Sequence, residues 1–327
     1  MDKIVPRFYG ENVPQTFTRE ISRDVLTGVM ITMAIITVSV YMPIIGFFCS
    51  LLLPLPVLFY RSKLGRKNGL IIPGAAMTIL VVLAGGISID VVFFLEMLFL
   101  GFLLSELFEM NLSVEKTVLY ACGGVLLTGV VGLVLYSNMS ATSIYSLVST
   151  YIAQNLEMTV ALYRGMGASE EFIHKFSTSL DQIQYGLIRI IPAMVTASFL
   201  MVTWSNLLMA RPLLKRRGLF FPAFGALNLW KAPDYLVWVL IGCGGLLILP
   251  GSTLKIIGIN GLLVLLMIYF FQGIAIVSFF FEKKQFPRPL RIFLYSLIAI
   301  QQIVLLIVIG LGLFDMWLNF RKTKSEE

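Results

Sequence analysis

Apolar side chains fall into nine long runs that contain almost no ionisable residue and are separated by polar or basic stretches. Each run is long enough to cross a hydrocarbon layer of about 30 Å as a helix. Because a helix bonds its own backbone groups in lipid, the pattern predicts an all-α, polytopic transmembrane helical bundle. The predicted spans are 25–42, 44–60, 69–86, 88–109, 117–137, 184–209, 234–250, 255–281 and 290–316.

A break is predicted within the first apolar stretch, which continues from Val25 to Tyr60. The stretch is about twice as long as one bilayer crossing. Pro43, followed by Gly46, lies near its middle and removes a helical hydrogen bond. The preceding residues 1–24 are polar and basic, and no small-residue cleavage site follows them, so we expect a retained N-terminal segment and not a cleaved signal peptide.

The run 234–250 leaves the number of spans open between nine and eight. It is short and contains residues that weaken helices, namely Gly242, Gly244, Gly245 and Pro250. It is therefore interpreted either as a full span or as a re-entrant, half-inserted segment. The second interpretation gives eight spans and moves the basic residues of 283–291 to the outside.

Residues 138–183 form the one long segment that is predicted on the outer side. Their apolar residues have helical spacing in two groups: Ile144, Leu147, Val148, Tyr151, Ile152 and Leu156, then Phe172, Phe176, Leu180 and Ile183. Ser169, followed by Glu170 and Glu171, is a typical helix start. The pattern predicts an amphipathic hairpin at the membrane surface, which either covers loop ends or acts as a lid over an outward-facing pocket.

Composition supports this class and excludes several others. Apolar residues make up 58% of the 327 residues and charged residues 13%, against about one quarter charged in soluble domains. The mean hydropathy is +0.89. These values exclude a soluble enzyme, a nucleic-acid-binding domain and a secreted disulfide scaffold.

The net charge of +7 indicates membrane topology and not nucleic-acid binding. With a cytoplasmic N-terminus, most of the 25 Lys and Arg residues fall in cytoplasmic loops, as the positive-inside rule requires. The tail fits this rule least well, because nine full spans place Arg321, Lys322 and Lys324 outside.

The candidate ligand-binding residues are ionisable groups inside predicted spans. A charge near the bilayer centre costs about 2.5 to 3.5 kcal/mol, so it persists where it is paired, protonated or in contact with water. Asp90, Glu96 and Glu106 all lie in the span 88–109. A rise of about 1.5 Å per residue places Glu96 near mid-depth, with Asp90 and Glu106 towards the two ends. Glu96 is thus the first candidate, and the alternative is a carboxyl that is bonded to neighbouring helices.

Arg189 is the basic residue clearly inside a predicted span near the outer face. It either pairs with Asp90, which is predicted at a similar depth, or binds an anionic ligand through its forked guanidinium. The alternative is that Arg189 extends to the outer headgroups while Asp90 packs at the water boundary.

Residues for metal, redox or nucleotide chemistry are sparse. Cys49, Cys122 and Cys243 lie singly in three runs, and His174 is the only histidine, so we expect packing cysteines, no metal and no cofactor. The chain has no G-x-x-x-x-G-K-[ST] phosphate loop, H-E-x-x-H pair or G-x-S-x-G elbow. We therefore expect that it is not an enzyme and has no ATPase activity of its own.

Uncharged polar and small residues in the runs are assigned to helix packing. Gln272, Gln301 and Gln302 carry amides that can hold helices together. The spacings of four in Gly46 with Ser50 and Gly101 with Ser105 allow helices to approach closely.

Five segments carry a resemblance to a known family. They are the Pro-containing break between the first two spans, Leu53-Pro-Leu-Pro56 leading into Arg61-Ser-Lys-Leu-Gly65, Leu100-Gly101 to Leu112-Ser113-Val-Glu115-Lys116, Phe224 to Trp238, and the ending Gly312-Leu-Phe-Asp315-Met-Trp317-Leu-Asn-Phe-Arg321. From about residue 20 to 321, the chain resembles the YybS-like family of predicted bacterial membrane proteins. Together with the charge pattern, the resemblance predicts a multi-pass protein of the bacterial inner (cytoplasmic) membrane with a cytoplasmic N-terminus.

That family is a domain of unknown function, distantly similar to the substrate-binding subunits of energy-coupling-factor transporters. The resemblance implies a six-span core that resembles such a subunit. Those subunits dock through an Ala-x-x-x-Ala pattern in the first span, where this chain has only Gly28 and Thr32 at that spacing, so the same coupling does not follow. The predicted domains are a cytoplasmic segment 1–24, the core with its hairpin 25–209, a basic cytoplasmic loop 210–233, additional spans 234–318 and a polar tail 319–327.

Two functions from different classes follow from these features. The first is binding or transport of a small or amphipathic solute, with Glu96 in a cavity between helices and the hairpin 138–183 as its gate. The alternative is a non-catalytic membrane scaffold that recruits cell-envelope or division partners through its basic loops. The expected partners are the lipid bilayer, a small-molecule ligand and a membrane protein, and no nucleic acid. A polar cavity at Glu96 favours the first function, and tight packing around a bonded Glu96 favours the second.

Overall fold

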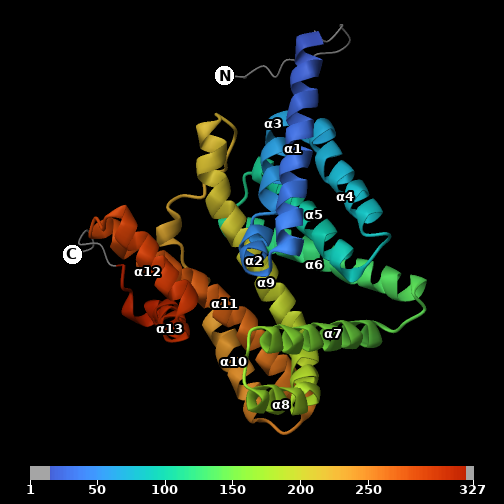
Figure 1. Ribbon diagram of the computed structural model, residues 1–327. Coiled ribbons are helices and arrows are strands. Elements are labelled where there is room, and N and C mark those ends of the chain that lie inside the picture. Colours follow the sequence, from blue (N-terminus) through green and yellow to red (C-terminus); the bar gives the residue numbers. More distant parts are fainter. Residues whose placement is uncertain (1–14, 322–327) are drawn as a thin grey trace, which may run out of the picture. The chain divides into compact units, whose positions relative to one another are not determined.

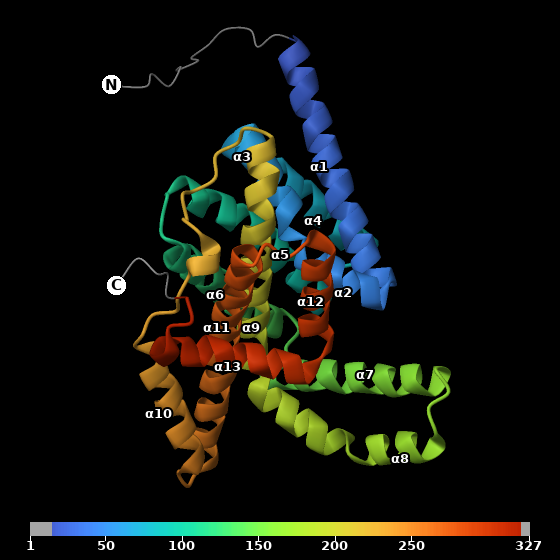
Figure 2. The same ribbon diagram turned by 90° about the vertical axis from the view of Figure 1, so that its left-hand side faces the viewer.

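The computed structural model describes residues 15–321, and every regular element in this range is a helix (Figures 1 and 2). The predicted all-α class is confirmed. In chain order the helices are α1 (Gln15–Tyr41), α2 (Pro43–Leu51), α3 (Pro54–Gly69), α4 (Ile71–Leu83), α5 (Ile89–Glu109), α6 (Val114–Met139), α7 (Ile144–Gly165), α8 (Glu170–Thr178), α9 (Leu180–Arg216), the short 3-10 helix η1 (Leu227–Leu229), α10 (Leu236–Ile248), α11 (Ser252–Lys283), α12 (Arg288–Ile300) and α13 (Gln302–Leu318).

The chain forms two compact units. Unit 1 comprises residues 1–129 and 202–222, and unit 2 comprises residues 130–201 and 223–327. Helices α6 and α9 each contribute one part to each unit. The predicted domain boundaries stay predictions.

Prolines set the helix breaks at the start of unit 1. Helix α1 ends at Tyr41 and α2 begins at Pro43, as predicted. A second, unpredicted break precedes Pro54, which begins α3. Proline suits the first position of a helix because its missing N–H has no partner there in any case. The side chain of Asn206, from α9, donates to the carbonyl of Leu51 at 2.7 Å and so satisfies backbone at this break.

The region after this break turns sharply and forms a bent pair of helical segments. Gly65 interrupts α3 with a φ of +78°, in the left-handed region that favours glycine. The segments Phe48–Gly69 and Ile71–Leu83 then meet at 87°. The predicted spans 44–60 and 69–86 therefore belong to one bent pair.

Helix α5 is the buried helix of unit 1. Ser88 caps its start by accepting the N–H of Val91 at 3.3 Å. Gly101 lies against the backbone of Pro54, and a side chain there would overlap the Pro54 carbonyl oxygen. The close helix approach predicted for Gly101 with Ser105 is thus confirmed, with α3 as the neighbouring helix.

The predicted hairpin is present in unit 2 as α7 and α8. Ser169 caps α8 by accepting the N–H of Phe172 at 3.3 Å, which confirms the predicted helix start. The rings of Tyr163 and Phe172 meet edge to face at 5.4 Å. The second helix is shorter than predicted, because α8 ends at Thr178 and residues from Leu180 onwards begin α9. The position of the hairpin at a membrane surface stays a prediction.

Helices α10, α11 and α13 pack closely through glycines. Gly258 of α11 lies against Cys243 of α10. Helix α13 crosses α11 at a steep angle (Figure 2). At this crossing, a side chain on Gly273 would overlap the carbonyl oxygen of Val308, and one on Gly312 would overlap that of Tyr269.

Fewer helical segments than the predicted nine qualify as candidate membrane spans. Among the described residues, five helical segments are long and apolar enough to cross a membrane: Glu20–Tyr41, Ile89–Glu109, Val114–Met139, Leu180–Arg216 and Ser252–Lys283. The count rises to seven if each of two bent pairs is one span. The second pair is α12 and α13, which meet at 100° near Gln301. Nine spans are not confirmed, because two predicted spans share one bent pair and 234–250 contains only the 13-residue helix α10.

Candidate functional site

The segment between α9 and α10, residues 228–235, lies along the second half of α11 in unit 2. It starts with the last two residues of the 3-10 helix η1 and has no helix after them, and it is called the non-helical segment below. Near one end, the amide of Asn228 donates to Glu282 at 2.7 Å. Four residues later, the N–H of Ala232 donates to the side chain of Gln272 at 3.1 Å. Helix α10 begins directly afterwards and packs on the first half of α11. The non-helical segment and α10 together lie along most of the length of α11.

Buried side chains satisfy the backbone of this segment. Arg321 donates to the carbonyls of Asn228, at 3.1 Å, and Trp230, at 2.8 Å. Arg321 also pairs with Asp315 at 2.6 Å, and these side chains are 3% and 0% exposed. Non-helical backbone must find such partners wherever water is excluded.

The same network extends to α11 and defines the end of α13. The side-chain NH2 group of Gln272 donates to Asp315 at 3.2 Å, and its carbonyl oxygen accepts the N–H of Ala232. Both ends of the Gln272 amide are therefore hydrogen-bonded. Asn319, in the left-handed conformation, ends α13 and turns the chain so that Arg321 reaches Asp315. Asn tolerates this conformation better than most residues. The packing role predicted for Gln272 is confirmed.

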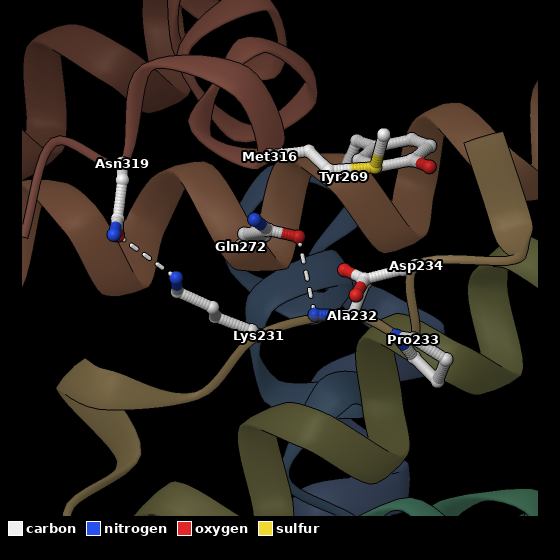
Figure 3. A pocket seen from close by; sticks show the side chains of 8 residues that line it. All are labelled: Lys231, Ala232, Pro233, Asp234, Tyr269, Gln272, Met316 and Asn319. Carbon is white, nitrogen blue, oxygen red and sulfur yellow. Dashed lines mark hydrogen bonds between the residues drawn. The ribbon is translucent and has the colours of Figure 1, made fainter.

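A polar pocket of about 210 Å³ lies between the non-helical segment, α11 and the end of α13 (Figure 3). Its lining residues are Lys231, Ala232, Pro233, Asp234, Tyr269, Gln272, Met316 and Asn319. Figure 3 shows Lys231 on the Asn319 side of the pocket and Asp234 on the Tyr269 side. The pocket therefore presents one cationic and one anionic side chain at opposite sides.

The height of this pocket along α11 is informative. The uncharged part of α11 extends from Ile256 to Phe281, and Tyr269 lies at its centre. At about 1.5 Å per residue, Tyr269 is about 25 Å from the first residue of α11 and about 21 Å from the last. If α11 crosses the bilayer, both charged side chains lie near its mid-plane.

Glu96, the first candidate from the sequence, is buried in unit 1. It is 6% exposed and accepts the hydroxyl of Thr128, from α6, at 2.9 Å. Gly129 lies beside the carboxyl group. The structure thus gives Glu96 a protein partner, as in the alternative of a carboxyl bonded to a neighbouring helix. By the criterion stated above, this packing favours the scaffold function over a solute site at Glu96 itself.

Glu106 belongs to a different group, an ion-pair network between α3 and α5. It pairs with Arg61, which also pairs with Glu109. Arg61 is 1% exposed and donates to the carbonyl of Ser105 at 3.2 Å. A second arginine, Arg66, lies 3.3 Å from Glu106. The structure does not bring Glu96 and Glu106 to a shared partner.

Asp90 and Arg189 are in different units. Asp90 is exposed in the first turn of α5. The guanidinium of Arg189 lies over the ring of Tyr185, 3.1 Å from its centroid, and donates to the Tyr185 carbonyl at 3.3 Å. The proposed pairing of Asp90 with Arg189 stays a prediction.

Sequence reasoning missed the pocket residues. It counted Lys231 as a loop charge and placed Asp234 at the start of an apolar span. The available signal was the short run 234–250, because a crossing that lacks helical length must take the remainder from the chain before it. That chain contains Lys231 and Asp234 on either side of Pro233.

Among the described residues, no three His, Cys, Asp or Glu side chains come together in a way that could hold a metal ion. Cys49, Cys122 and Cys243 are free, and Cys122 contacts the hydroxyl of Thr203 at 3.4 Å. The groups available for recognition in the pocket are thus charges, amides and a phenol.

Comparison with known proteins gives a family without an assigned function. The family model described as "Predicted membrane protein (DUF2232)" matches residues 30–316. The chain is 24% identical over 297 residues to the uncharacterized protein YybS of Bacillus subtilis (strain 168). This alignment covers 88% of the chain and 93% of that relative. No solved structure matches. Most of the pocket lining, from Lys231 to Met316, falls within the matched range.

Proposed function

Since the chain belongs to the DUF2232 family of predicted membrane proteins, we propose that it binds a small solute in the pocket of unit 2 as one step of moving that solute across the membrane. The proposed location is the bacterial inner membrane, with the N-terminus in the cytoplasm, as the distribution of Lys and Arg favours.

The observation that carries this proposal is the position of Lys231 and Asp234 at mid-height of α11. Charges at this depth are costly in lipid, so they are expected to face a water-filled cavity or a ligand. Non-helical backbone at membrane depth is likewise tolerated where it is buried in protein or lines a cavity. Residues 228–235 combine both features.

Hydrogen bonds within the protein hold the surroundings of the pocket in place. Arg321 and Gln272 form hydrogen bonds with the backbone of the non-helical segment, and Asp315 accepts hydrogen bonds from both of them. Segments of this kind, next to the start of a shortened helix, form the solute sites of many transporters. Here the shortened helix is α10, which begins two residues after Asp234.

Glu96 has a supporting role in this proposal. Its bond to Thr128 joins α5 to α6 within unit 1. The hairpin of α7 and α8 remains a candidate gate. The chain is proposed to be non-catalytic and to take its energy from an ion gradient or a partner protein, because it carries no phosphate loop.

The test is the thermal unfolding of the purified full chain in detergent, with and without a low-molecular-weight extract of bacterial cells. A bound solute stabilises the folded state by mass action, so the extract should raise the unfolding midpoint. Asp234→Asn should remove the rise, whereas Lys284→Gln, a change of an exposed residue outside the pocket, should keep it. No rise in the wild-type chain contradicts solute binding. Co-purification of a stoichiometric protein partner would then support the scaffold function.

A further inference from the structure

The two charged side chains of the pocket differ in how they are bonded. The ammonium of Lys231 donates one hydrogen bond to Asn319, at 2.9 Å. An ammonium has three donors, so two remain for a ligand. Within residues 15–321, the Asp234 carboxylate receives no hydrogen bond and forms no ion pair. Both residues line the pocket and are exposed.

The other polar groups of the lining contribute less to ligand choice. The Gln272 amide is occupied at both ends, by Ala232 and Asp315. Tyr269 and Met316 supply an aromatic and a thioether surface on the Asp234 side of the pocket (Figure 3). The charged groups with unused hydrogen-bonding capacity are therefore a donor at Lys231 and an acceptor at Asp234, next to the uncharged phenol of Tyr269 and amide of Asn319.

From this arrangement we infer that the pocket takes a small zwitterion of amino-acid size, with its ammonium on Asp234 and its carboxylate on Lys231. This inference rests on the proposed function. Tyr269 and Met316 receive the hydrocarbon part of the solute.

The charge balance of the lining separates this class from singly charged solutes. A simple amine would pair with Asp234 and leave the charge of Lys231 without an ion-pair partner at mid-height of α11. A simple carboxylate would leave Asp234 in the same state. An unpaired charge away from water is costly, whereas a zwitterion forms ion pairs with both Lys231 and Asp234 at once.

The volume sets the size of the solute. Pockets for drug-sized ligands enclose about 300–1,000 Å³, and this one encloses about 210 Å³. A single amino acid fits this volume.

The experiment compares three probes on the purified full chain in detergent: a mixture of the twenty standard amino acids, a mixture of the amines that lack their carboxylates, and a mixture of the acids that lack their amino groups. We expect the amino acids to raise the unfolding midpoint at concentrations roughly tenfold lower than either singly charged mixture. Asp234→Asn and Lys231→Met should each abolish that response, and Lys284→Gln should keep it.

The outcomes separate this inference from the proposed function. If amines act as well as amino acids and Lys231→Met keeps the response, the pocket is a cation site and the zwitterion inference fails, although solute binding stands. If the cell extract raises the midpoint in a way that depends on Asp234 but the amino acids do not, the zwitterion inference also fails and solute binding stands. If neither the extract nor any mixture acts, both proposals fail. The midpoint of each variant without solute shows whether it is folded.

Discussion

Asn260 of α11 bonds to the backbone of α9 at Ala193, one residue after Pro192. Its carbonyl oxygen accepts the N–H of Ala193 at 2.9 Å, and its amide donates to the carbonyl of Arg189 at 2.8 Å. Ala193 and Arg189 are the two residues whose backbone groups bond each other in an uninterrupted helix. Proline weakens the ladder at this point, and a side chain from a neighbouring helix supports it.

Asn260→Ala should lower the free energy of unfolding by about 1 to 3 kcal/mol, because it leaves two backbone groups of α9 with one partner fewer. Pro192→Ala should reduce this loss, since it restores the regular helix, so the double variant should lose less than the sum of the singles. The measurement is the unfolding midpoint in detergent. Asn155→Ala is the control, because Asn155 bonds only within its own exposed helix turn. Additive losses in the double variant contradict the proposed bridge.

Arg321→Met should destabilise the protein by about 3 to 5 kcal/mol, because it leaves the fully buried Asp315 without its cation. The double variant with Asp315→Leu should recover part of this loss, since the uncompensated charge is then gone. Lys175→Met is the matched control, because it breaks an exposed pair with Glu171 on α8 that should contribute less than about 1 kcal/mol. Equal effects of Arg321→Met and Lys175→Met in thermal unfolding would show that the buried pair does not stabilise unit 2.

The hydrophobic pattern predicted the helices well but not the number of crossings. It located α5 within one residue and the Ser169 cap of α8, because apolar length and capping residues act locally. It did not predict the 87° and 100° bends. Bends of this kind depend on how distant parts of the chain pack together, and periodicity carries no information about such packing.

The candidate site was harder to predict for a related reason. Glu96 attracted attention because a lone carboxylate in an apolar run is unusual, but a hydroxyl on another helix, Thr128, bonds it. From the sequence, Lys231 looked like an ordinary loop residue and Asp234 like the first residue of a span, because their depth depends on how residues 228–235 pack along α11. Local sequence shows where a charge is costly, and tertiary structure decides which charge has a partner.

Gly273→Ala and Gly312→Ala should each destabilise the crossing of α11 and α13 by about 1 to 3 kcal/mol, because the added methyl group overlaps a backbone carbonyl of the other helix. Gly310→Ala is the control on α13. Nothing lies within 4 Å of the methyl group it adds, so it should be neutral or stabilising by up to about 1 kcal/mol through its higher helix propensity. Unfolding midpoints of the three variants test this. A loss in Gly310→Ala as large as in Gly312→Ala would contradict the close crossing.

Glu96→Gln should leave solute-dependent stabilisation intact, because Glu96 is bonded to Thr128 in unit 1 and the pocket lies in unit 2. The glutamine carbonyl can still accept the Thr128 hydroxyl, so the unfolding midpoint without solute should change little, by less than about 1 kcal/mol in free energy. Glu96→Leu removes both the charge and the acceptor, whereas Glu96→Gln removes only the charge. Comparing the two variants therefore separates the effect of the hydrogen bond from that of the charge. The measurement is the shift in midpoint with the cell extract, beside Asp234→Asn, which should lose it. If Glu96→Gln abolishes the shift and Asp234→Asn keeps it, the solute site lies at Glu96, as the sequence first suggested.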